Sequence, residues 1–286
     1  MSKRILVIGA TGRVGSEVVK LLTKHGEAVR AVTRNPTKIS SRFDNSVEAV
    51  EFDYDRPQTF AGALAGVEKI FLVVRPGDNH SDKAAKPLIE EAKKMKIRHI
   101  VALTAMGVEQ DETFMLRILE KDIEESGIAY THLRPNWFMQ NLDSGPMYAD
   151  IKATGALHLP AADAGISFID SRDVAAVGFA SLTEAGHEGK AYTLTGNESL
   201  SFFQATEKIS RAAGKEILYI PISEDTAREA LVKGGIPSGL IERWTEFYRK
   251  IRKGLCAPIS PDAESVLKRP LILFDQYAKD YAASWK

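Results

Sequence analysis

The chain has 286 residues, of which 44% are hydrophobic and 27% are charged, as in ordinary globular proteins. Lys plus Arg and Asp plus Glu both number 38, and this balance gives no reason to expect binding to nucleic acid or to an acidic membrane surface. No apolar run reaches the roughly 18 residues of a membrane span. The single cysteine, Cys256, excludes an internal disulfide and fits a cytoplasmic protein.

The first half of the chain alternates short apolar runs with amphipathic stretches. We predict buried strands at six runs rich in Val and Ile: Ile5–Ile8, Ala28–Thr33, Val47–Phe52, Ile70–Val74, Ile100–Thr104 and Ile128–Leu133. Helices are predicted between them at Ser16–Lys24, Ala84–Met95 and Met115–Glu125. This alternation predicts an α/β fold with a doubly wound parallel sheet of the Rossmann type, covered by helices on both faces.

The second half of the chain has a different character. Residues 134–165 are rich in Gly, Pro and Asn, which indicates an irregular connection. Residues 166–182, "ISFIDSRDVAAVGFASL", predict a further strand and then a helix with Asp170 or Ser171 as its N-cap. From Ser199 on, we expect mostly helix, with one strand near Ile217–Ile220.

The run "VIGATGRVG" holds Gly9, Gly12 and Gly15 directly between the first strand and the first helix. Gly9 permits a tight turn, Gly12 lets the backbone approach a pyrophosphate, and Gly15 lets helix and strand pack closely. The N–H groups at the start of the helix would bind the phosphates. Because the G-K-[ST] ending of a nucleoside-triphosphate loop is missing, the motif favours a dinucleotide.

The end of the second strand indicates which dinucleotide binds. An NAD site usually has Asp or Glu there, about 20 residues after the glycines, to bind the ribose 2′-hydroxyl. This chain has Arg34, with Arg13 and Lys38 as further cations, and a guanidinium suits a 2′-phosphate. We therefore expect NADP(H). The alternative is that Arg34 only ends a strand at a solvated edge.

The expected cofactor site continues along the ends of the later strands. Asp53, after the third strand, could bind the adenine amino group, although a helix N-cap is an equally simple interpretation. The predicted cofactor-binding residues are Gly9, Thr11, Gly12, Arg13, Val14, Gly15, Arg34, Asp53, Val74, Thr104 and Pro135.

In these stretches the chain resembles the NmrA-like branch of the atypical short-chain dehydrogenase/reductases. The matching stretches are "GATGRVG", "RNP", "FDYDRP", "EKDIEESGIAYTHLRPNWFMQN" and "FIDSRDVAAV". The branch includes NADPH-dependent quinone reductases, triphenylmethane-dye reductases, isoflavone-type reductases and NADP-sensing regulators. The C-terminal lobe resembles them only in general character.

The resemblance also implies where catalytic residues would lie. Catalytic members of the wider superfamily use a Ser after the fifth strand and a Tyr-x-x-x-Lys pair in the next helix, where the lysine lowers the tyrosine's pKa. Glu120 resembles the acidic residue four positions after that lysine, which puts Leu116 at the lysine and Glu112 at the tyrosine. Ala105 stands at the serine. We therefore assign no catalytic residue.

Another pair repeats the catalytic spacing. Tyr148 and Lys152 fit Tyr-x-x-x-Lys, but they follow the sixth strand, too late in the chain for the catalytic helix. We interpret the spacing as a coincidence. The six histidines show no metal-ligand spacing with one another or with Cys256, so we expect no metal.

The stretch "NWFMQN" follows the sixth strand, at the sheet edge where open parallel sheets bind ligands. Its aromatic and amide side chains suit a flat ring with polar groups. Alternatively, its two aromatic residues only join the two lobes. The predicted substrate-binding residues are Met106, Asn136, Trp137, Phe138 and Asn141.

Together these features predict an NADP(H)-binding Rossmann domain over residues 1–150, to which 166–196 return, and a substrate-binding lobe over 151–286. The expected function is NADPH-dependent reduction of a quinone-like or aromatic, conjugated small molecule by direct hydride transfer, without the Ser and Tyr-x-x-x-Lys set. The alternative is a non-catalytic NADP(H)-sensing regulator of the NmrA type with a protein partner. An epimerase or dehydratase is disfavoured by Glu112 at the tyrosine position, and the oligomeric state is left open.

Overall fold

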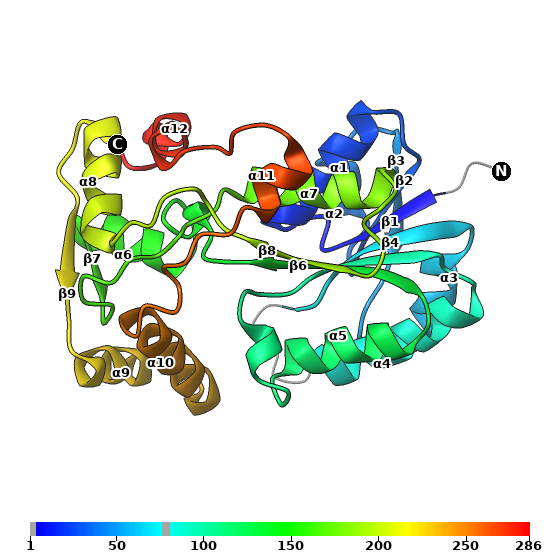
Figure 1. Ribbon diagram of the computed structural model, residues 1–286, viewed down its shortest axis with the longest axis horizontal. Helices are drawn as coiled ribbons and strands as arrows, with labels where there is room; N and C mark the ends of the chain where they lie inside the picture. Colours follow the sequence, from blue (N-terminus) through cyan, green and yellow to red (C-terminus); the bar gives the residue numbers. More distant parts are fainter. Residues whose placement is uncertain (1–3, 76–80) are drawn as a thin grey trace. The chain divides into compact units, whose positions relative to one another are not determined.

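The computed structural model describes residues 4–75 and 81–286 (Figure 1). Its main sheet has seven strands in the order β3-β2-β1-β4-β5-β6-β8, and each neighbouring pair is parallel. The strands are β1 (Arg4–Ile8), β2 (Val29–Thr33), β3 (Val47–Glu51), β4 (Val67–Val73), β5 (His99–Leu103), β6 (Ala129–Pro135) and β8 (Lys190–Leu194). The order steps outward from β1 in both directions, so the predicted doubly wound Rossmann-type sheet is confirmed.

Helices cover both faces of this sheet (Figure 1). One layer contains α1 (Arg13–Lys24) and α7 (Ser171–Thr183), which pack against each other. The other contains α3 (Phe60–Leu64), α4 (Ser81–Lys94) and α5 (Met115–Glu125). Short elements complete this part of the chain: α2 (Thr37–Ser40), α11 (Asp262–Leu267), η1 (Pro57–Thr59) and η2 (Val108–Gln110).

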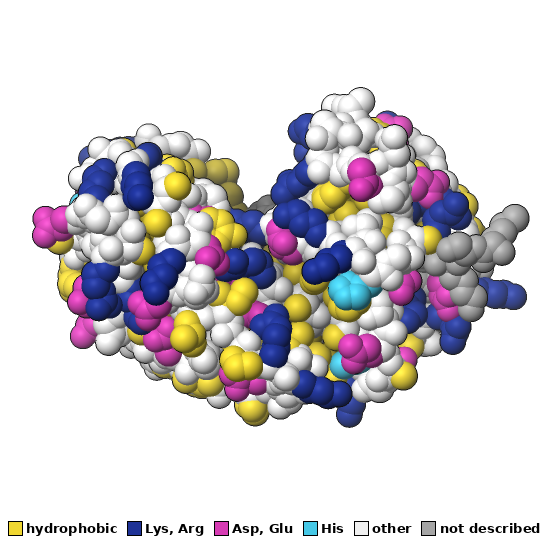
Figure 2. Space-filling view, turned by 90° about the horizontal axis from the view of Figure 1, so that it is seen from above, with side chains coloured by type: hydrophobic (Ala, Val, Ile, Leu, Met, Phe, Trp, Pro, Cys, Tyr) yellow, Lys and Arg dark blue, Asp and Glu magenta, His cyan; other side chains and the backbone are white. Residues whose placement is uncertain are grey.

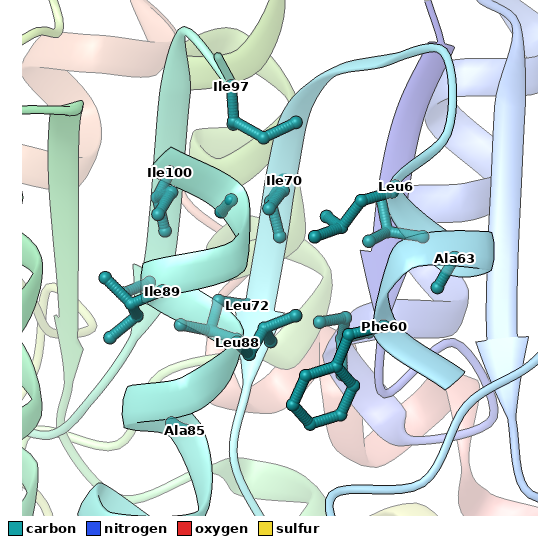
Figure 3. Close-up of a cluster of buried hydrophobic side chains, with 14 of the residues drawn as sticks. Leu6, Phe60, Ala63, Ile70, Leu72, Ala85, Leu88, Ile89, Ile97 and Ile100 are labelled. Carbon is teal, nitrogen blue, oxygen red and sulfur yellow. The ribbon is translucent and has the colours of Figure 1, made fainter. Parts of the chain in front are cut away.

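The layer of α3, α4 and α5 encloses a continuous apolar core. Leu6, Ile70 and Ile100 project from three adjacent strands toward Phe60 and Leu88 on the helices (Figure 3), and all five are at most 2% exposed. Burying a side chain of this size stabilises the fold by roughly 1.5–3 kcal/mol. Because helices cover both faces, the central strands β1, β4 and β5 contain runs of consecutive buried residues rather than an alternating pattern.

A buried arginine joins the sheet to α3. Arg30, in β2, donates two hydrogen bonds of 3.0 Å to the carboxylate of Glu48 in β3. Its Nη1 donates to the carbonyl oxygens of Gly62, Ala63 and Ala65 at 3.1, 2.9 and 2.7 Å. These carbonyls lie at the C-terminal end of α3, where helical partners are missing, so a side chain from the sheet caps the helix.

Contacts divide the chain into two units. The first contains Met1–Pro135, Ser171–Leu194 and Asp262–Arg269, and the second contains Asn136–Asp170, Thr195–Pro261 and Pro270–Lys286. The sequence places the first boundary at 150, whereas the contacts place it at Pro135, because α6 packs on β7 of the second unit. The binding roles assigned to the two parts stay predictions.

The second unit is mostly helical around a small parallel sheet of β7 and β9. Its elements are η3 (Met139–Asn141), α6 (Pro146–Thr154), β7 (Ala156–Leu159), α8 (Phe202–Ala213), β9 (Leu218–Pro221), α9 (Glu224–Lys233), α10 (Ser238–Arg252), α12 (Phe274–Asp280) and η4 (Ala282–Ser284). Aromatic rings form much of its core. Phe168 packs edge-on against Phe202 and Phe274, and Tyr277 packs edge-on against the buried Trp285.

Two expectations about local structure were wrong. The stretch 134–165 is not irregular, because it contains α6 and β7. α6 starts with Pro146 at its first turn and ends at Gly155 with φ +73°, both ordinary helix-boundary signals. The strand expected before α7 is absent from the described sheets, since Ile166 and Ile169 make only isolated bridges. β8 follows α7 instead. The strand near Ile217–Ile220 is confirmed as β9.

In the described part of the chain, no helix has the length and apolarity needed to cross a bilayer. The space-filling view shows basic and acidic side chains on the same face of the molecule (Figure 2), in keeping with the zero net charge.

Candidate functional site

The glycine turn leads directly from β1 into α1. Gly9 has a φ of +80°, and the backbone N–H of Gly12 donates to the carbonyl oxygen of Gly9 at 2.8 Å. The first helical residue is Arg13, and the first turn of α1 contains no acidic side chain. The helix N-terminus is therefore suited to an anion through its backbone N–H groups and its dipole.

Side chains cannot replace the three glycines without moving the turn. A Cβ on Gly15 would lie 2.3 Å from the carbonyl oxygen of Gly9, and one on Gly12 would lie 3.1 Å from the same oxygen. A Cβ on Gly9 would lie 2.9 Å from the Cβ of Val73 in β4. The turn thus forms a cradle of bare backbone, and such a cradle fits a dinucleotide pyrophosphate.

The register of the sheet brings Arg34 to the same edge as this turn. Ile8 at the end of β1 pairs with Val32 in β2, and Arg34 follows β2 directly. Arg34 is exposed and makes no hydrogen bond or ion pair with residues 4–75 or 81–286. Its charge helps Arg75 to lower the pKa of the Asp55 carboxyl. The predicted contact of Arg34 with a 2′-phosphate stays a prediction. Arg13 is half-buried and Lys38, in α2, is exposed.

Asp53 is already engaged by other side chains. Arg75 Nη2 donates to its Oδ1 at 3.2 Å, and Arg56 Nε lies 3.5 Å from its Oδ2. The backbone N–H of Asp55 also donates to Oδ1, at 3.2 Å. This pattern holds the loop after β3 rather than leaving a free carboxylate for adenine. The predicted contact with adenine stays a prediction, as does that of the buried Val74 at the end of β4.

The three positions that the resemblance marks as catalytic have other environments. Leu116 is partly buried and packs against the core cluster of the first unit. Glu112 is exposed and forms an ion pair with Lys121. Ala105 lies after β5 and carries no polar side-chain atom. None of the three positions offers a hydroxyl or an amine to a substrate.

Instead, a buried carboxylate dominates this edge of the sheet. Glu120 is fully buried in α5 and accepts a hydrogen bond of 2.8 Å from the hydroxyl of Thr104, at the end of β5. Arg134 of β6 donates to both of its oxygens, at 2.9 and 2.7 Å, and Arg117 donates to Oε2 at 3.1 Å. Burial alone would raise the pKa of Glu120, but the hydrogen bonds from Arg134 and Thr104 hold it below its ordinary value.

Three side chains around Glu120 are close enough together to be considered as metal ligands. Ligand-type atoms of Glu120, Glu124 and His132 lie within 4.8 Å of one another. However, Arg117 donates to both carboxylates, at 3.1 and 2.8 Å, and His132 Nε2 lies 3.2 Å from Glu124. The guanidinium groups of Arg117 and Arg134 already supply the positive charge that a cation would bring. We therefore assign no metal to this cluster.

Tyr148 and Lys152 contact the C-terminal segment of the chain. The Tyr148 hydroxyl donates to the carbonyl oxygen of Ser284 at 2.9 Å, and Lys152 Nζ lies 3.5 Å from the same oxygen and 3.3 Å from that of Lys286. Both residues belong to α6 of the second unit. These contacts support the interpretation of the pair as a coincidence.

The predicted substrate residues fall into both units. Met106, in the first unit, is half-buried, and its N–H donates to the carbonyl oxygen of Pro135 at 2.9 Å. Asn136 is buried in the second unit, and its amide donates to Ser167 Oγ and to the carbonyl oxygen of Cys256, both at 2.8 Å. Asn136 therefore holds two distant segments together through its Nδ2. Only its Oδ1 is left for a contact with substrate.

The aromatic residues after Asn136 also make contacts within the second unit. The ring of Trp137 lies 5.9 Å from that of Tyr248 and 6.3 Å from that of Phe202. Phe138 is half-buried and pairs in an isolated bridge with Ile169. These contacts lie within the second unit, and the alternative that the two rings join the lobes stays a prediction. A substrate role for them and for the half-buried Asn141 stays a prediction.

Sequence reasoning missed the arginines that organise the site. Arg134 and Arg117 neutralise Glu120, and Arg75 holds Asp53. Only Arg134 had a visible signal, because it stands in the matching stretch "THLRP". Arg117 stands at the i,i+3 helical spacing from Glu120, which sequence reasoning did not use, whereas Arg75 lies 22 residues from Asp53 and had no local signal.

The parallel sheet and the glycine turn between β1 and α1 define a Rossmann-type fold. The chain belongs to the NmrA-like family, whose model matches residues 1–266. It is 34% identical over 286 residues to the NAD(P)H azoreductase of Xenophilus azovorans, covering 98% of this chain and 99% of the relative. It is 30% identical over 247 residues to quinone oxidoreductase 2 of Escherichia coli strain K12, covering 83% and 84%.

A similar solved structure is the triphenylmethane reductase of Citrobacter sp. complexed with NADP(H). It matches with a TM-score of 0.83 at 25% identity and covers 98% of this chain and all of that one. The predicted family is thus confirmed, and its reductase members are relatives of this chain.

Proposed function

We propose that this protein is an NADPH-dependent reductase of a quinone-like or other aromatic, conjugated small molecule, acting by direct hydride transfer. The observation that carries the proposal is the glycine cradle between β1 and α1, in a chain that is 34% identical to an NAD(P)H azoreductase. Relatives named for azo, quinone and triphenylmethane substrates support the same class of acceptor.

The residues of the first unit would bind the cofactor through its phosphates. The backbone of the turn at Gly9, Gly12 and Gly15 would hold the pyrophosphate, and Arg34 would bind the 2′-phosphate. When bound there, NADPH supplies the hydride. The ends of β5 and β6, with Thr104 and Pro135, would contact the remainder of the cofactor and hold it in one orientation.

Among the described residues, the three family catalytic positions and Thr104 offer no free proton to a substrate, and this narrows the substrate class that we propose. The hydroxyl of Thr104 donates to Glu120, so its proton is already committed. A simple ketone needs an acid at its oxygen when it accepts hydride. A quinone or an extended conjugated system spreads the new negative charge and can take its proton from water. The site therefore favours conjugated acceptors.

The test is oxidation of NADPH by the purified protein, followed by absorbance, with quinones, azo dyes, triarylmethane dyes and conjugated enones. Simple ketones are the matched control. We expect saturable turnover with at least one conjugated class and only background rates with ketones. Efficient ketone reduction would contradict the substrate class, because it would require a proton donor at this site.

The same assay separates the second candidate, a non-catalytic NADP(H) sensor. The three altered catalytic positions are the observation that favours it. Tight NADPH binding without turnover on any acceptor would contradict the reductase proposal and support the sensor. Failure to bind NADPH at all would contradict both.

A further inference from the structure

A second arginine contacts the glycine turn. Arg42 Nη1 donates a hydrogen bond of 2.8 Å to the carbonyl oxygen of Thr11, within the turn. Its guanidinium also lies 5.9 Å from the ring centre of Phe43. Arg42 follows α2, and α2 follows Arg34 and β2. The bond to Thr11 therefore links the turn after β1 to the segment after β2, across the edge where these two strands end.

Acidic side chains near this edge have other partners. The Asp44 carboxylate accepts from the backbone N–H of Ser46 at 2.9 Å, and hydrogen bonds from Ser46 hold its pKa below the ordinary value. Asp55 pairs with Arg75 at 2.8 Å. The guanidinium of Arg42 has no carboxylate partner among the residues that the structure describes. Two exposed cations therefore lie at this edge: Arg34 directly follows β2, and Arg42 bonds to Thr11 in the turn after β1.

We infer that Arg42 is a second determinant of NADP(H) preference, because its guanidinium binds the same 2′-phosphate as Arg34. The inference rests on the proposed NADP(H) site. A phosphate dianion has enough acceptor oxygens for two guanidinium groups, and charge-assisted hydrogen bonds to it are strong. The neutral 2′-hydroxyl of NAD(H) gains little from a second cation. Arg42 therefore adds to the difference in affinity between the two cofactors.

The experiment compares nucleotides that differ only in the 2′-phosphate. Calorimetry measures the dissociation constants of 2′,5′-ADP and 5′-AMP for the wild type, Arg42→Gln and Arg34→Gln. Arg211→Gln, which removes an exposed charge at the end of α8 in the second unit, is the control. We expect Arg42→Gln to raise the dissociation constant of 2′,5′-ADP at least about tenfold and to change that of 5′-AMP less than about twofold. Arg211→Gln should change neither.

Each of the remaining outcomes would overturn the inference, and the results for the two nucleotides tell these outcomes apart. Equal losses for both nucleotides would show that Arg42 acts only on the turn, through Thr11. If Arg34→Gln abolishes the preference and Arg42→Gln retains it, Arg42 is no phosphate ligand and the NADP(H) site stands. If the wild type itself shows no preference for 2′,5′-ADP, the NADP(H) assignment fails together with this inference. Thermal unfolding without ligand checks that the exposed Arg42 can be replaced without loss of the fold.

Discussion

Glu120 and Arg134 form a two-point ion pair inside the first unit. Arg134 Nε donates to Oε1 at 2.9 Å and Nη2 donates to Oε2 at 2.7 Å, while Glu120 has no exposed surface. The pair joins α5 to β6 at the carboxyl edge of the sheet, beside Thr104. A buried carboxylate thus stands one helical turn after the position where relatives of the wider superfamily have a catalytic lysine.

Replacing Glu120 by Gln should destabilise the fold by about 3 kcal/mol, because the buried carboxylate would lose its charge opposite Arg134 and Arg117. The remaining partners of these arginines, Glu109 and Glu124, are more exposed than Glu120. The control is Glu112→Gln, which removes an exposed carboxylate that pairs with Lys121 and, at 3.5 Å, with Arg117, and it should cost less than about 1 kcal/mol. Denaturant unfolding of both variants measures the difference. Equal stability of the two variants would show that the network contributes nothing beyond a surface pair.

Replacing Gly15 by Ala should weaken NADPH binding by at least about tenfold, because the turn must move and its N–H groups lose their alignment on the phosphates. The new Cβ would lie 2.3 Å from the carbonyl oxygen of Gly9, which is backbone and cannot rotate away. Gly62→Ala is the control, since its Cβ would meet nothing within 4 Å. Calorimetric titration with NADPH compares the affinities of the two variants. Unchanged affinity in Gly15→Ala would show that the turn is not part of the proposed cofactor site.

Tyr148→Phe should leave turnover unchanged and cost only about 1 kcal/mol of stability, from the lost hydrogen bond to Ser284. Steady-state rates with the best acceptor and unfolding by denaturant test both parts. If turnover falls strongly while NADPH affinity and folding stay intact, Tyr148 is a proton donor and the spacing to Lys152 is functional.

Stability should fall below neutral pH because of His99. Burial, helped by Lys69, lowers its pKa from 6.5 to about 4, and its Nε2 lies 2.9 Å from Thr131 Oγ1. The unfolded chain therefore takes up a proton as pH falls through 6.5, whereas the folded chain resists until about 4. Above pH 7 both states are neutral at this residue, and it has no effect.

Between pH 7 and pH 5 this difference should cost about 2 kcal/mol. Denaturant unfolding at the two pH values measures the loss in the wild type and in His99→Gln, where this contribution should vanish. The buried His132, whose pKa burial also lowers, contributes in the same direction and is common to both proteins. An identical pH dependence in the two proteins would contradict the assignment to His99.

Local signals predicted much of the first unit. The apolar runs and the glycine triplet stand next to one another in the chain, so the strand, turn and helix around Gly9 could be read directly. β7 and β8 had no such signal. β7 is a four-residue strand that pairs with β9, far along the chain, and β8 is exposed at its start with a weak apolar pattern.

The sequence by itself determined the fold class, the family and the glycine cradle, because each depends on residues close together in the chain. Tertiary structure decided which charges meet. Glu120 of α5 meets Thr104 and Arg134 from two strand ends, and Arg42 reaches Thr11, through contacts between segments that are distant in the chain. Side-chain pairing across a sheet depends on strand order and helix packing, and no local spacing in the chain encodes those positions.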